Sequence, residues 1–509
     1  MTFMQQTSSI NVSSEIGTLK RLLIHSPDGG IGKVVPGKFK EWLYDDTVHL
    51  AQMRREYNEY IKLLLYFLDP EKIPYILECE KKQVNQKQAD CFKPDNPAYF
   101  NSDKVLETQF LLTQILKNEA LRQRIISGVC AWEGCSFATE RTLQTITDAA
   151  ELAKVLITGV LHNKDKSIKE FVFAPVPNFI FTRDIGITIN DHLLLSNAAT
   201  AARERENLLM KFISFYYLFE GNEDKLIEIS ESSDFFLLDE NEQKDFKTSV
   251  EGGDVMMIAP NHLLIGVSER TTPSAADEVI HKIFANNKTG IEKITVIKIP
   301  HHRAVMHIDT VFTHVRKDTW VLFGKFSERV GQERNDKQFA YYRYLLDKDY
   351  VPEHESIEIF RFYKPIAETY QPGKDYLTDI SDKVKGLESL LRSISIEDFG
   401  IAESDVKIIY SGNNVFPHDE REQWTDSCNL LALKNGVVVG YDRNEETFKG
   451  FMANGFTVIK VGELLKKFEN NELTPAEVKD TLIVLPSAEL SRARGGAHCM
   501  SMPLLREKI

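Results

Sequence analysis

The sequence repeats one short pattern several times along its 509 residues. Each copy runs from a charged residue into an apolar segment, a tight polar turn and a second apolar segment, which is the pattern of a β-hairpin. A weak first copy and four clear copies begin after Glu15, Asp184, Asp254, Asp309 and Asp426. Helical stretches separate them. Hairpin units placed around an axis would direct their charged heads toward one place.

Three of these heads carry residue types that are typical of catalytic sites. They are Phe181–Asp184 (FTRD), Glu251–Asp254 (EGGD) and His307–Asp309 (HID). Taken separately, Asp184 could close a turn and pair with its neighbour Arg183, and EGGD fits a β-turn. Carboxylates and a histidine that converge on one axis are an arrangement for catalysis rather than for folding. We therefore expect these heads to form one active site.

A cysteine, Cys499, lies close to the end of the chain in the run 491–503 (SRARGGAHCMSMP). The two glycines before it allow a close backbone turn, and Pro503 is expected to end regular structure after it. Two arginines and His498 surround the thiol, and nearby cations lower the pKa of a cysteine toward the reactive thiolate. Alone, Cys499 would be read as a small buried apolar residue; together with the polar heads upstream it is predicted to be a nucleophile.

Composition bounds the function. The net charge of −13 and the lack of a basic stripe argue against a nucleic-acid partner. No apolar stretch reaches about 18 residues, so we expect no membrane span, and the first residues lack the regions of a signal peptide. Six cysteines without a C-x-x-C pair are typical of reduced thiols in a cytoplasmic protein.

Helical periodicity places the remaining elements. Residues 38–68 predict one long amphipathic helix that ends at Asp69–Pro70, and the polar residues 79–101 are expected to form a loop. The signal is helical from about 102 to 160, and again at 380–395. We therefore divide the chain into a catalytic domain and an inserted helical module. The catalytic domain takes 1–101 and 171–509, and the module takes 102–170.

A metal site is the main alternative for the segment that holds His301, His302, His307 and Asp309. On a strand, His307 and Asp309 would face the same side, whereas adjacent His301 and His302 would face opposite sides. No later pair of histidine, glutamate or cysteine completes a tetrahedral set. We therefore expect no metal.

The motifs FTRD, EGGD, H-x-D and GGAHCMSMPL (495–504), in this order, resemble arginine deiminase, a family of the guanidino-group-modifying superfamily. Further matches are SEIGTLKRLLIHSP, LYDD, PNFIF, EQWTD and VVVGYDRN. The resemblance implies a five-bladed α/β propeller of ββαβ units with an inserted helical module. This chain departs from the family by extra residues at 70–100 and 320–405, and by Asn413–Asn414 where glycine and aspartate are expected.

By this resemblance the protein hydrolyses L-arginine to L-citrulline and ammonia without a metal or organic cofactor. Cys499 would attack the guanidinium carbon and form a covalent thiouronium intermediate. His307 would protonate the leaving ammonia and then activate water. Asp184 and Asp309 would bind the guanidinium, since carboxylates bind its N–H groups in pairs, and Glu251 would add a further acceptor and help to manage protons.

The resemblance also implies a set of substrate-binding residues. The substrate's α-carboxylate would be held by arginines, with Arg205 close enough to replace Arg203, while other residues line the aliphatic and α-amino side. The set is Asn178, Phe181, Arg203, Asp254, Arg270 and Arg494. Two alternatives stay open: an amidinotransferase or deiminase for another guanidino compound, and a non-catalytic guanidine-binding protein of the same fold. The sequence leaves homo-oligomer formation open.

Overall fold

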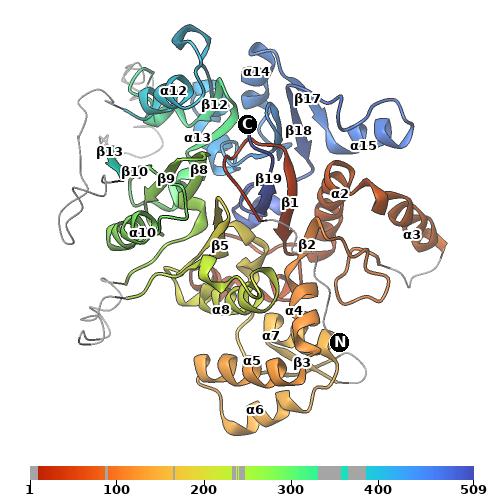
Figure 1. Cartoon of the computed structure of the whole chain (residues 1–509). Coiled ribbons are helices and arrows are strands. Elements are labelled where there is room, and N and C mark those ends of the chain that lie inside the picture. Colours follow the sequence, from red (N-terminus) through yellow and green to blue (C-terminus); the bar gives the residue numbers. More distant parts are fainter. Residues whose placement is uncertain are drawn as a thin grey trace.

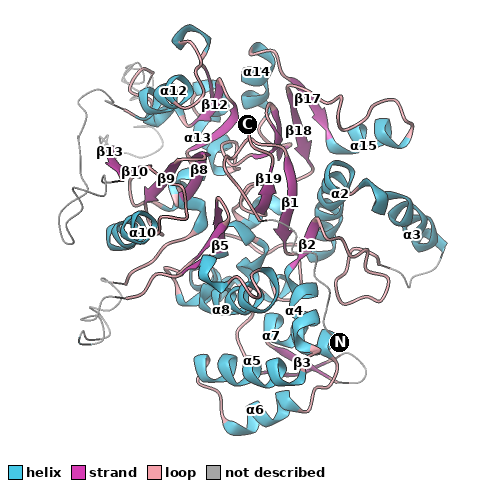
Figure 2. Ribbon diagram, in the orientation of Figure 1, coloured by secondary structure: helices cyan, strands magenta, loops and turns pink. Residues whose placement is uncertain are grey.

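The computed structural model describes residues 10–85, 90–163, 167–231, 237, 239, 247–330, 357–364 and 386–509. Helices and strands alternate along most of this part of the chain, so the protein is of the mixed α/β class (Figure 2). Figure 1 shows the strands gathered toward the middle of the molecule and the helices mainly around the outside. In the described residues the strands form six sheets, five of which have three or four strands.

The four clear hairpins predicted from the sequence are confirmed, since each has two antiparallel strands joined by a short turn. Nearly all of their residues are buried, and strands buried on both faces read as continuous apolar runs. The hairpins are β5 (Gly186–Ile189) with β6 (His192–Leu195), β8 (Val255–Ala259) with β9 (His262–Val267), β11 (Phe312–Arg316) with β12 (Thr319–Leu322), and β15 (Leu431–Lys434) with β16 (Val437–Tyr441).

After each hairpin, a helical segment returns the chain to a third strand that pairs parallel with the hairpin's second strand. A parallel partner requires such a crossover. The third strands are β7 (Leu226–Ile227), β10 (Lys293–Lys298), β14 (Lys407–Tyr410) and β18 (Thr481–Leu485). The helices of these crossovers are α8 (Glu204–Ile213), α10 (Pro273–Ala285), α12 (Leu387–Glu397), α14 (Glu445–Ala453) and α15 (Val461–Glu469). A further helix, α13 (His418–Trp424), lies between β14 and β15, and two sheets gain β13 (Glu358–Tyr363) and β17 (Thr457–Lys460).

A further three-stranded sheet joins the two ends of the described chain. β1 (Leu19–Ile24) lies between β19 (Met502–Arg506), which is antiparallel, and β2 (Val105–Glu107), which is parallel. The prediction that Pro503 ends regular structure is wrong, because Pro503 lies within β19. β19 is an edge strand of its sheet, which is where a sheet tolerates proline. This pairing carries Cys499, three residues before β19, into the middle of the molecule.

Two expectations for the N-terminal helices are wrong. The single helix expected over 38–68 is divided into α1 (Phe39–Trp42) and α2 (Leu50–Leu68), because the chain leaves the helix at Leu43, whose φ is 62°. The expected loop at 79–101 begins later, since α3 (Ile73–Asn85) continues through Cys79. Ile73, Ile76 and Cys79 are buried at a spacing of three, and the charged residues between them hid this helix in the sequence.

The described part of the helical module contains four helices, within the region where the sequence predicts helix: α4 (Thr108–Leu116), α5 (Glu119–Trp132), α6 (Phe137–Gln144) and α7 (Ala149–Thr158). The side chain of Asp148 caps the start of α7 by accepting from the N–H groups of Ala150 and Glu151. Beyond α7 lies a small hairpin of β3 (Val160–His162) and β4 (Ile168–Phe171). Residues 105–107, expected in the module, belong instead to the sheet of β1.

α12 accounts for the helix expected at 380–395, of which residues 380–385 lie outside the described residues. Most of the extra segment 320–405 lies outside them as well, as do residues 1–9. Asn413 and Asn414 both adopt a left-handed conformation, with φ of 54° and 58°, which asparagine tolerates better than most residues. Among the described helices, none has the length and apolar character needed to cross a membrane.

The charged heads precede the hairpins as single 3₁₀ turns. Thr182–Ile185 precedes β5, Gly252–Asp254 precedes β8, and Ile308–Thr310 precedes β11. The expectation that His307 and Asp309 share one side of a strand is therefore wrong. The two residues reach the site from the start and the middle of a turn, which allows them to contact different partners.

Candidate active site

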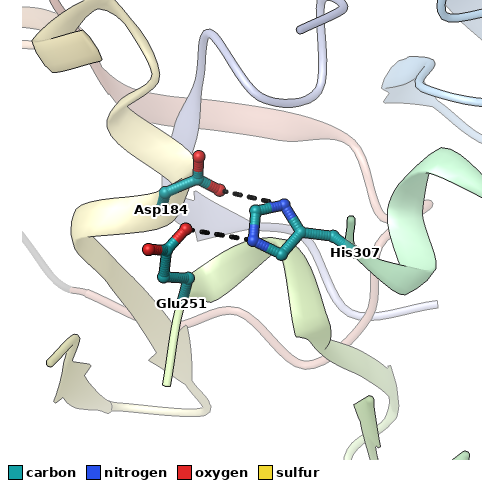
Figure 3. Close-up of side chains that lie close together, drawn as sticks. All are labelled: Asp184, Glu251 and His307. Atoms are coloured by element: carbon teal, nitrogen blue, oxygen red, sulfur yellow. Dashed lines mark hydrogen bonds and ion pairs between the residues drawn. The ribbon is translucent and has the colours of Figure 1, made fainter. Parts of the chain in front are cut away.

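Three hairpin heads meet around His307 (Figure 3). Nε2 of His307 lies 3.1 Å from Oε2 of Glu251, and its Nδ1 lies 3.9 Å from Oδ1 of Asp184. All three side chains are buried. The convergence predicted from the hairpin pattern is thus confirmed for these heads.

The electrostatics of this cluster favour a protonated histidine. Burial alone would lower the pKa of His307, but the carboxylates of Asp184 and Glu251 outweigh burial and raise that pKa to about 10. Burial would raise the pKa of Glu251, yet Arg203 and His307 hold it well below its usual range. At neutral pH, the ligand-free protein therefore holds an imidazolium that can donate a proton to a leaving group.

Cys499 lies at the same place, in the turn before β19. Its Sγ is 3.6 Å from Oδ2 of Asp309. Its backbone is held on both sides, because its N–H donates to Oδ1 of Asn429 at 3.0 Å and its carbonyl accepts from the N–H of Arg183, also at 3.0 Å. The thiol is thereby fixed against the turn that carries Asp184.

The cysteine is a neutral thiol in the ligand-free protein. Burial, together with the carboxylates of Asp309 and Asp184, raises the pKa of Cys499 well above its usual range. The expectation that neighbouring cations lower this pKa is wrong here, because burial and the carboxylates outweigh them, and Arg492 and His498 are themselves paired with carboxylates. A cation that bound beside Asp309 would remove the charge that disfavours the thiolate.

A buried chain of charges lies behind Asp309. Nδ1 of His498 lies 2.8 Å from Oδ2 of Asp309, and its Nε2 lies 3.3 Å from Oε2 of Glu15. Glu15 also pairs with Nη2 of Arg183 at 2.5 Å, so Arg183 does not pair with Asp184 as one reading of the sequence allowed. Burial would raise the pKa of Asp309, but the bond from His498 lowers it. The sequence marked Glu15 only as the head of the weak first unit.

The glycines before Cys499 are needed because other groups approach the backbone closely. A Cβ added to Gly495 would lie 2.3 Å from Cε1 of Phe181, and one added to Gly496 would lie 2.4 Å from the carbonyl oxygen of Asn429. Real Cβ atoms do not approach so closely, so any larger residue would displace the turn. The close turn predicted from the two glycines is confirmed.

Two buried carboxylate oxygens near the thiol have no hydrogen-bond donor among the residues that the structure describes. They are Oδ1 of Asp184 and Oδ1 of Asp309. An unpaired buried acceptor costs roughly 1–3 kcal/mol, so its presence in a site indicates that a ligand supplies the donor. A planar cation with several N–H groups, such as a guanidinium, fits this pair.

Two arginines offer the opposite chemistry. Nε of Arg270, and both Nε and Nη1 of Arg494, are buried without a hydrogen-bond acceptor in the described part of the chain. Arg270 has an ion pair with Glu269 at 3.4 Å, and its charge acts on Glu251. The charge of Arg494 acts on Cys499. Both guanidinium groups are therefore close enough to the site to receive an anionic part of a ligand.

Arg203 lies inside the carboxylate cluster. Its Nη1 donates to Asp184 at 2.7 Å and to Glu251 at 3.3 Å, and its Nε donates to Glu206 at 2.9 Å. Arg205 points elsewhere, with its guanidinium bound to Glu133 and to backbone carbonyls. Of the two arginines, only Arg203 faces the site, and in the ligand-free protein it neutralises the carboxylates.

The other predicted substrate-binding residues are also buried at the site. Asn178 donates to the carbonyl of Trp42 at 3.0 Å, and Phe181 packs against the backbone before Cys499. Asp254 has both oxygens occupied, one by the N–H of Ile308 at 3.0 Å and one by the hydroxyl of Ser268 at 2.6 Å. Its geometry is that of a residue that holds the turn after His307.

The residues that could hold a metal ion in the structure differ from the set that the sequence suggested. His301 and His302 are exposed, and His302 caps the turn that begins at Arg303. Ligand atoms of Asp184, Glu251 and His307 do lie within 4.8 Å of one another, which is close enough for a metal ion. The cation that Arg203 places on both carboxylates already supplies the positive charge there, and it would repel a metal ion.

A buried thiol beside carboxylates that lack donors, with an imidazolium to move protons, defines a cysteine-dependent site for a cationic substrate. The comparisons agree with this class. A family model described as arginine deiminase matches residues 136–506, which include every group of the site except Glu15. The chain belongs to the arginine deiminase family.

Three relatives are arginine deiminases that align along nearly the whole of both chains. They come from Borrelia garinii subsp. bavariensis (27% identical over 508 residues, 98% of each chain), Latilactobacillus sakei subsp. sakei strain 23K (27% over 511 residues, 99% of each) and Clostridium perfringens strain SM101 (27% over 510 residues, 99% of this chain and 100% of the relative). The solved structure of an amidinotransferase from Microseira wollei overlays on 98% of both chains at 11% identity, with a TM-score of 0.44.

Proposed function

We propose that this protein hydrolyses L-arginine to L-citrulline and ammonia. One observation carries the proposal. Carboxylate oxygens of Asp184 and Asp309 that accept no hydrogen bond from the described residues lie near the thiol of Cys499, and guanidinium nitrogens of Arg270 and Arg494 that donate none lie around the same site. A substrate that satisfies all of them has a guanidinium at one end and a carboxylate at the other. L-arginine has this form.

Substrate binding activates the nucleophile. The guanidinium neutralises Asp309 and Asp184, two of the carboxylates that raise the pKa of Cys499, so the thiol releases its proton to solvent and becomes a thiolate when the substrate arrives. The thiolate attacks the guanidinium carbon and forms a C–S bond, which gives a neutral tetrahedral adduct. His307 donates its proton to one amino group, the C–N bond breaks, and ammonia leaves behind an S-alkylthiouronium cation.

The second half-reaction uses the same histidine as a base. The bound cation weakens the pull of Asp184 on the His307 proton, so the imidazole, once neutral, can accept a proton from water. The hydroxide adds to the thiouronium carbon, and the adduct collapses to citrulline. The C–S bond breaks, and the hydroxyl proton returns to the sulfur, which restores the thiol of Cys499.

The α-carboxylate of the substrate is assigned to Arg270 and Arg494, which have free donors. The family resemblance adds Arg203, but this arginine would have to leave Asp184 and Glu251 to reach a substrate carboxylate. Asn178 and Phe181 are assigned to the aliphatic and α-amino side. Asp254 is assigned to positioning, because the N–H of Ile308, in the turn that carries His307, binds one of its oxygens and the hydroxyl of Ser268 binds the other.

We also propose that the fold is a five-bladed α/β propeller. The repeated unit of hairpin, helix and parallel third strand supports this, with the sheet of β1, β2 and β19 as the blade that the two chain ends complete. The helical module that follows β2, from Thr108 onward, would be an insertion in that blade. A cytoplasmic location is supported by the cysteines, all six of which are free thiols.

The proposal is tested by incubating the protein with arginine, with agmatine and with arginine plus an amine acceptor, each with and without chelator. Citrulline and ammonia in equal amounts from arginine alone support it. A guanidino group transferred to the amine would instead indicate an amidinotransferase. Binding of arginine without citrulline would indicate a non-catalytic guanidine-binding protein. Cys499→Ala should abolish citrulline formation, because it removes the nucleophile. Cys428→Ala is its matched control and should not, since Cys428 is also a buried, free thiol.

A further inference from the structure

The side chain of Arg494 is held by an aromatic ring rather than by a carboxylate. Its guanidinium carbon lies 3.5 Å from the ring centroid of Trp424, the last residue of α13. Trp424 is 42% exposed, while Arg494 is only 6% exposed. The ring of Trp424 thus covers the guanidinium of Arg494, while part of the Trp424 side chain stays in contact with solvent.

The backbone fixes Arg494 in this direction. The residue follows the 3₁₀ turn Leu490–Ala493 in a left-handed conformation, with φ of 59° and ψ of 76°. A non-glycine residue in this region carries strain and persists where its surroundings demand it. The next residue is Gly495, which packs on Phe181, so the turn that carries Arg494 is continuous with the turn that carries the nucleophile.

Charges near Arg494 leave its hydrogen-bond donors free. Asp426 and Asp45 attract the guanidinium through space, while Arg303 repels it. Asp45 is bound to Arg303 at 3.1 Å, and no hydrogen bond joins Asp426 to Arg494 among the described residues. Contact with the ring of Trp424 therefore holds the guanidinium in place without using its N–H groups.

We propose that Trp424 is a positioning residue for substrate recognition, an inference that rests on the proposed function. A cation held over a ring face by about 0.5–2 kcal/mol keeps its N–H groups in the guanidinium plane available. A carboxylate in place of the ring would occupy two of those groups and compete with the substrate's α-carboxylate. The stack thus orients Arg494 and leaves Nε and Nη1 free for the ligand.

The stack acts only on substrates that have an α-carboxylate. Loss of the ring would let the Arg494 side chain sample other rotamers, and the substrate would then have to restore the correct one during binding. The effect falls on the binding of arginine and not on the chemistry at Cys499. Agmatine, which lacks the carboxylate, gains nothing from an oriented Arg494.

The test compares Trp424→Ala, Trp424→Phe and the control Trp132→Ala, which truncates an exposed tryptophan at the end of α5 (56% exposed). Trp424→Ala should raise KM for arginine by ~3- to 30-fold and change kcat by less than ~2-fold. Trp424→Phe should recover most of the loss, and Trp132→Ala should match the unmodified protein. Kinetics with agmatine should not change in any of the three variants.

A fall in kcat, or an equal loss for agmatine and arginine, would mean that Trp424 has only a structural role and would overturn the proposal. The stack is also measured without turnover. Subtracting the emission spectrum of Trp424→Phe isolates this tryptophan from the other three. Arg494→Leu should change the isolated emission, and an unchanged emission would overturn the stack itself. If the unmodified protein forms no citrulline, the proposed function fails, while the emission result still decides whether the stack exists.

Discussion

Replacement of Asp309 by asparagine should change the thiol and the reaction in opposite directions. In the ligand-free protein, the carboxylate of Asp309 lies 3.6 Å from Sγ of Cys499 and is, after burial, the main cause of the raised pKa of that thiol. Two like charges near 4 Å repel by about 4 kcal/mol at an effective dielectric constant of about 20. His498 stays held by Glu15, so it does not leave with the carboxylate.

The asparagine should therefore make Cys499 more reactive and the enzyme less active. Alkylation of ligand-free Asp309→Asn by iodoacetamide at neutral pH should be at least ~10-fold faster, because a part of the repulsion is enough for that factor. Turnover of arginine should fall, since the substrate loses one or two charge-assisted bonds of about 1.5–3 kcal/mol each, or roughly 10–10⁴-fold in kcat/KM.

The assay follows alkylation of Cys499 by peptide mass spectrometry and citrulline formation by a colorimetric method. Asp398→Asn is the matched control, since Asp398 is half-buried and also lies within hydrogen-bond distance of a histidine, His262, at 2.7 Å. This control should leave both rates close to those of the unmodified protein. Slower or unchanged alkylation of Asp309→Asn, or turnover within tenfold of the unmodified protein, would refute the electrostatic account of the thiol.

Three further predictions follow from the same geometry. Agmatine should be turned over with a kcat/KM about 10²–10⁴-fold below that of arginine, because it leaves the donors of Arg270 and Arg494 unpaired; similar efficiencies would contradict this role. His307→Ala should lower kcat by about 10²–10⁴-fold with a smaller effect on KM, and EDTA should change nothing; loss of activity that zinc or manganese restores would revive the metal alternative. The pKa of buried His25, which burial would lower, is raised to about 9 by bonds to two carboxylates. Its stabilising effect is therefore complete below about pH 6.5 and is lost as pH rises through about 9. The urea concentration at the unfolding midpoint should decrease as pH rises from about 7 to about 10, and it should decrease less in His25→Gln.

The hairpins and their heads could be predicted because their signal is local. Each strand is buried on both faces and therefore reads as an apolar run, and each head is a short polar turn directly before it. Pairing between distant segments left no such signal. No local pattern near Met502–Arg506 indicates that this segment pairs with Leu19–Ile24. Pro503 disfavours a strand in the middle of a sheet, and the sequence does not show that β19 lies at an edge.

The site could be predicted as a set of residues but not as a set of charge states. The cations around Cys499 suggested a lowered pKa, yet the sequence does not show that His498 and Arg492 are paired with carboxylates in the fold. Arg203 and Arg205 likewise could not be told apart. They are two residues apart at the start of α8, and the turn directs one into the carboxylate cluster and the other toward Glu133.

The covalent intermediate on Cys499 is the most direct test of the proposed reaction. The protein is mixed with arginine, quenched with acid during the first turnovers, digested and examined by mass spectrometry. The account predicts an adduct of arginine minus ammonia on the peptide that contains Cys499, and it predicts that the adduct forms more slowly in His307→Ala, which cannot protonate the leaving ammonia. Citrulline formation with no adduct on any cysteine, or an adduct on Cys428 instead, would contradict the account.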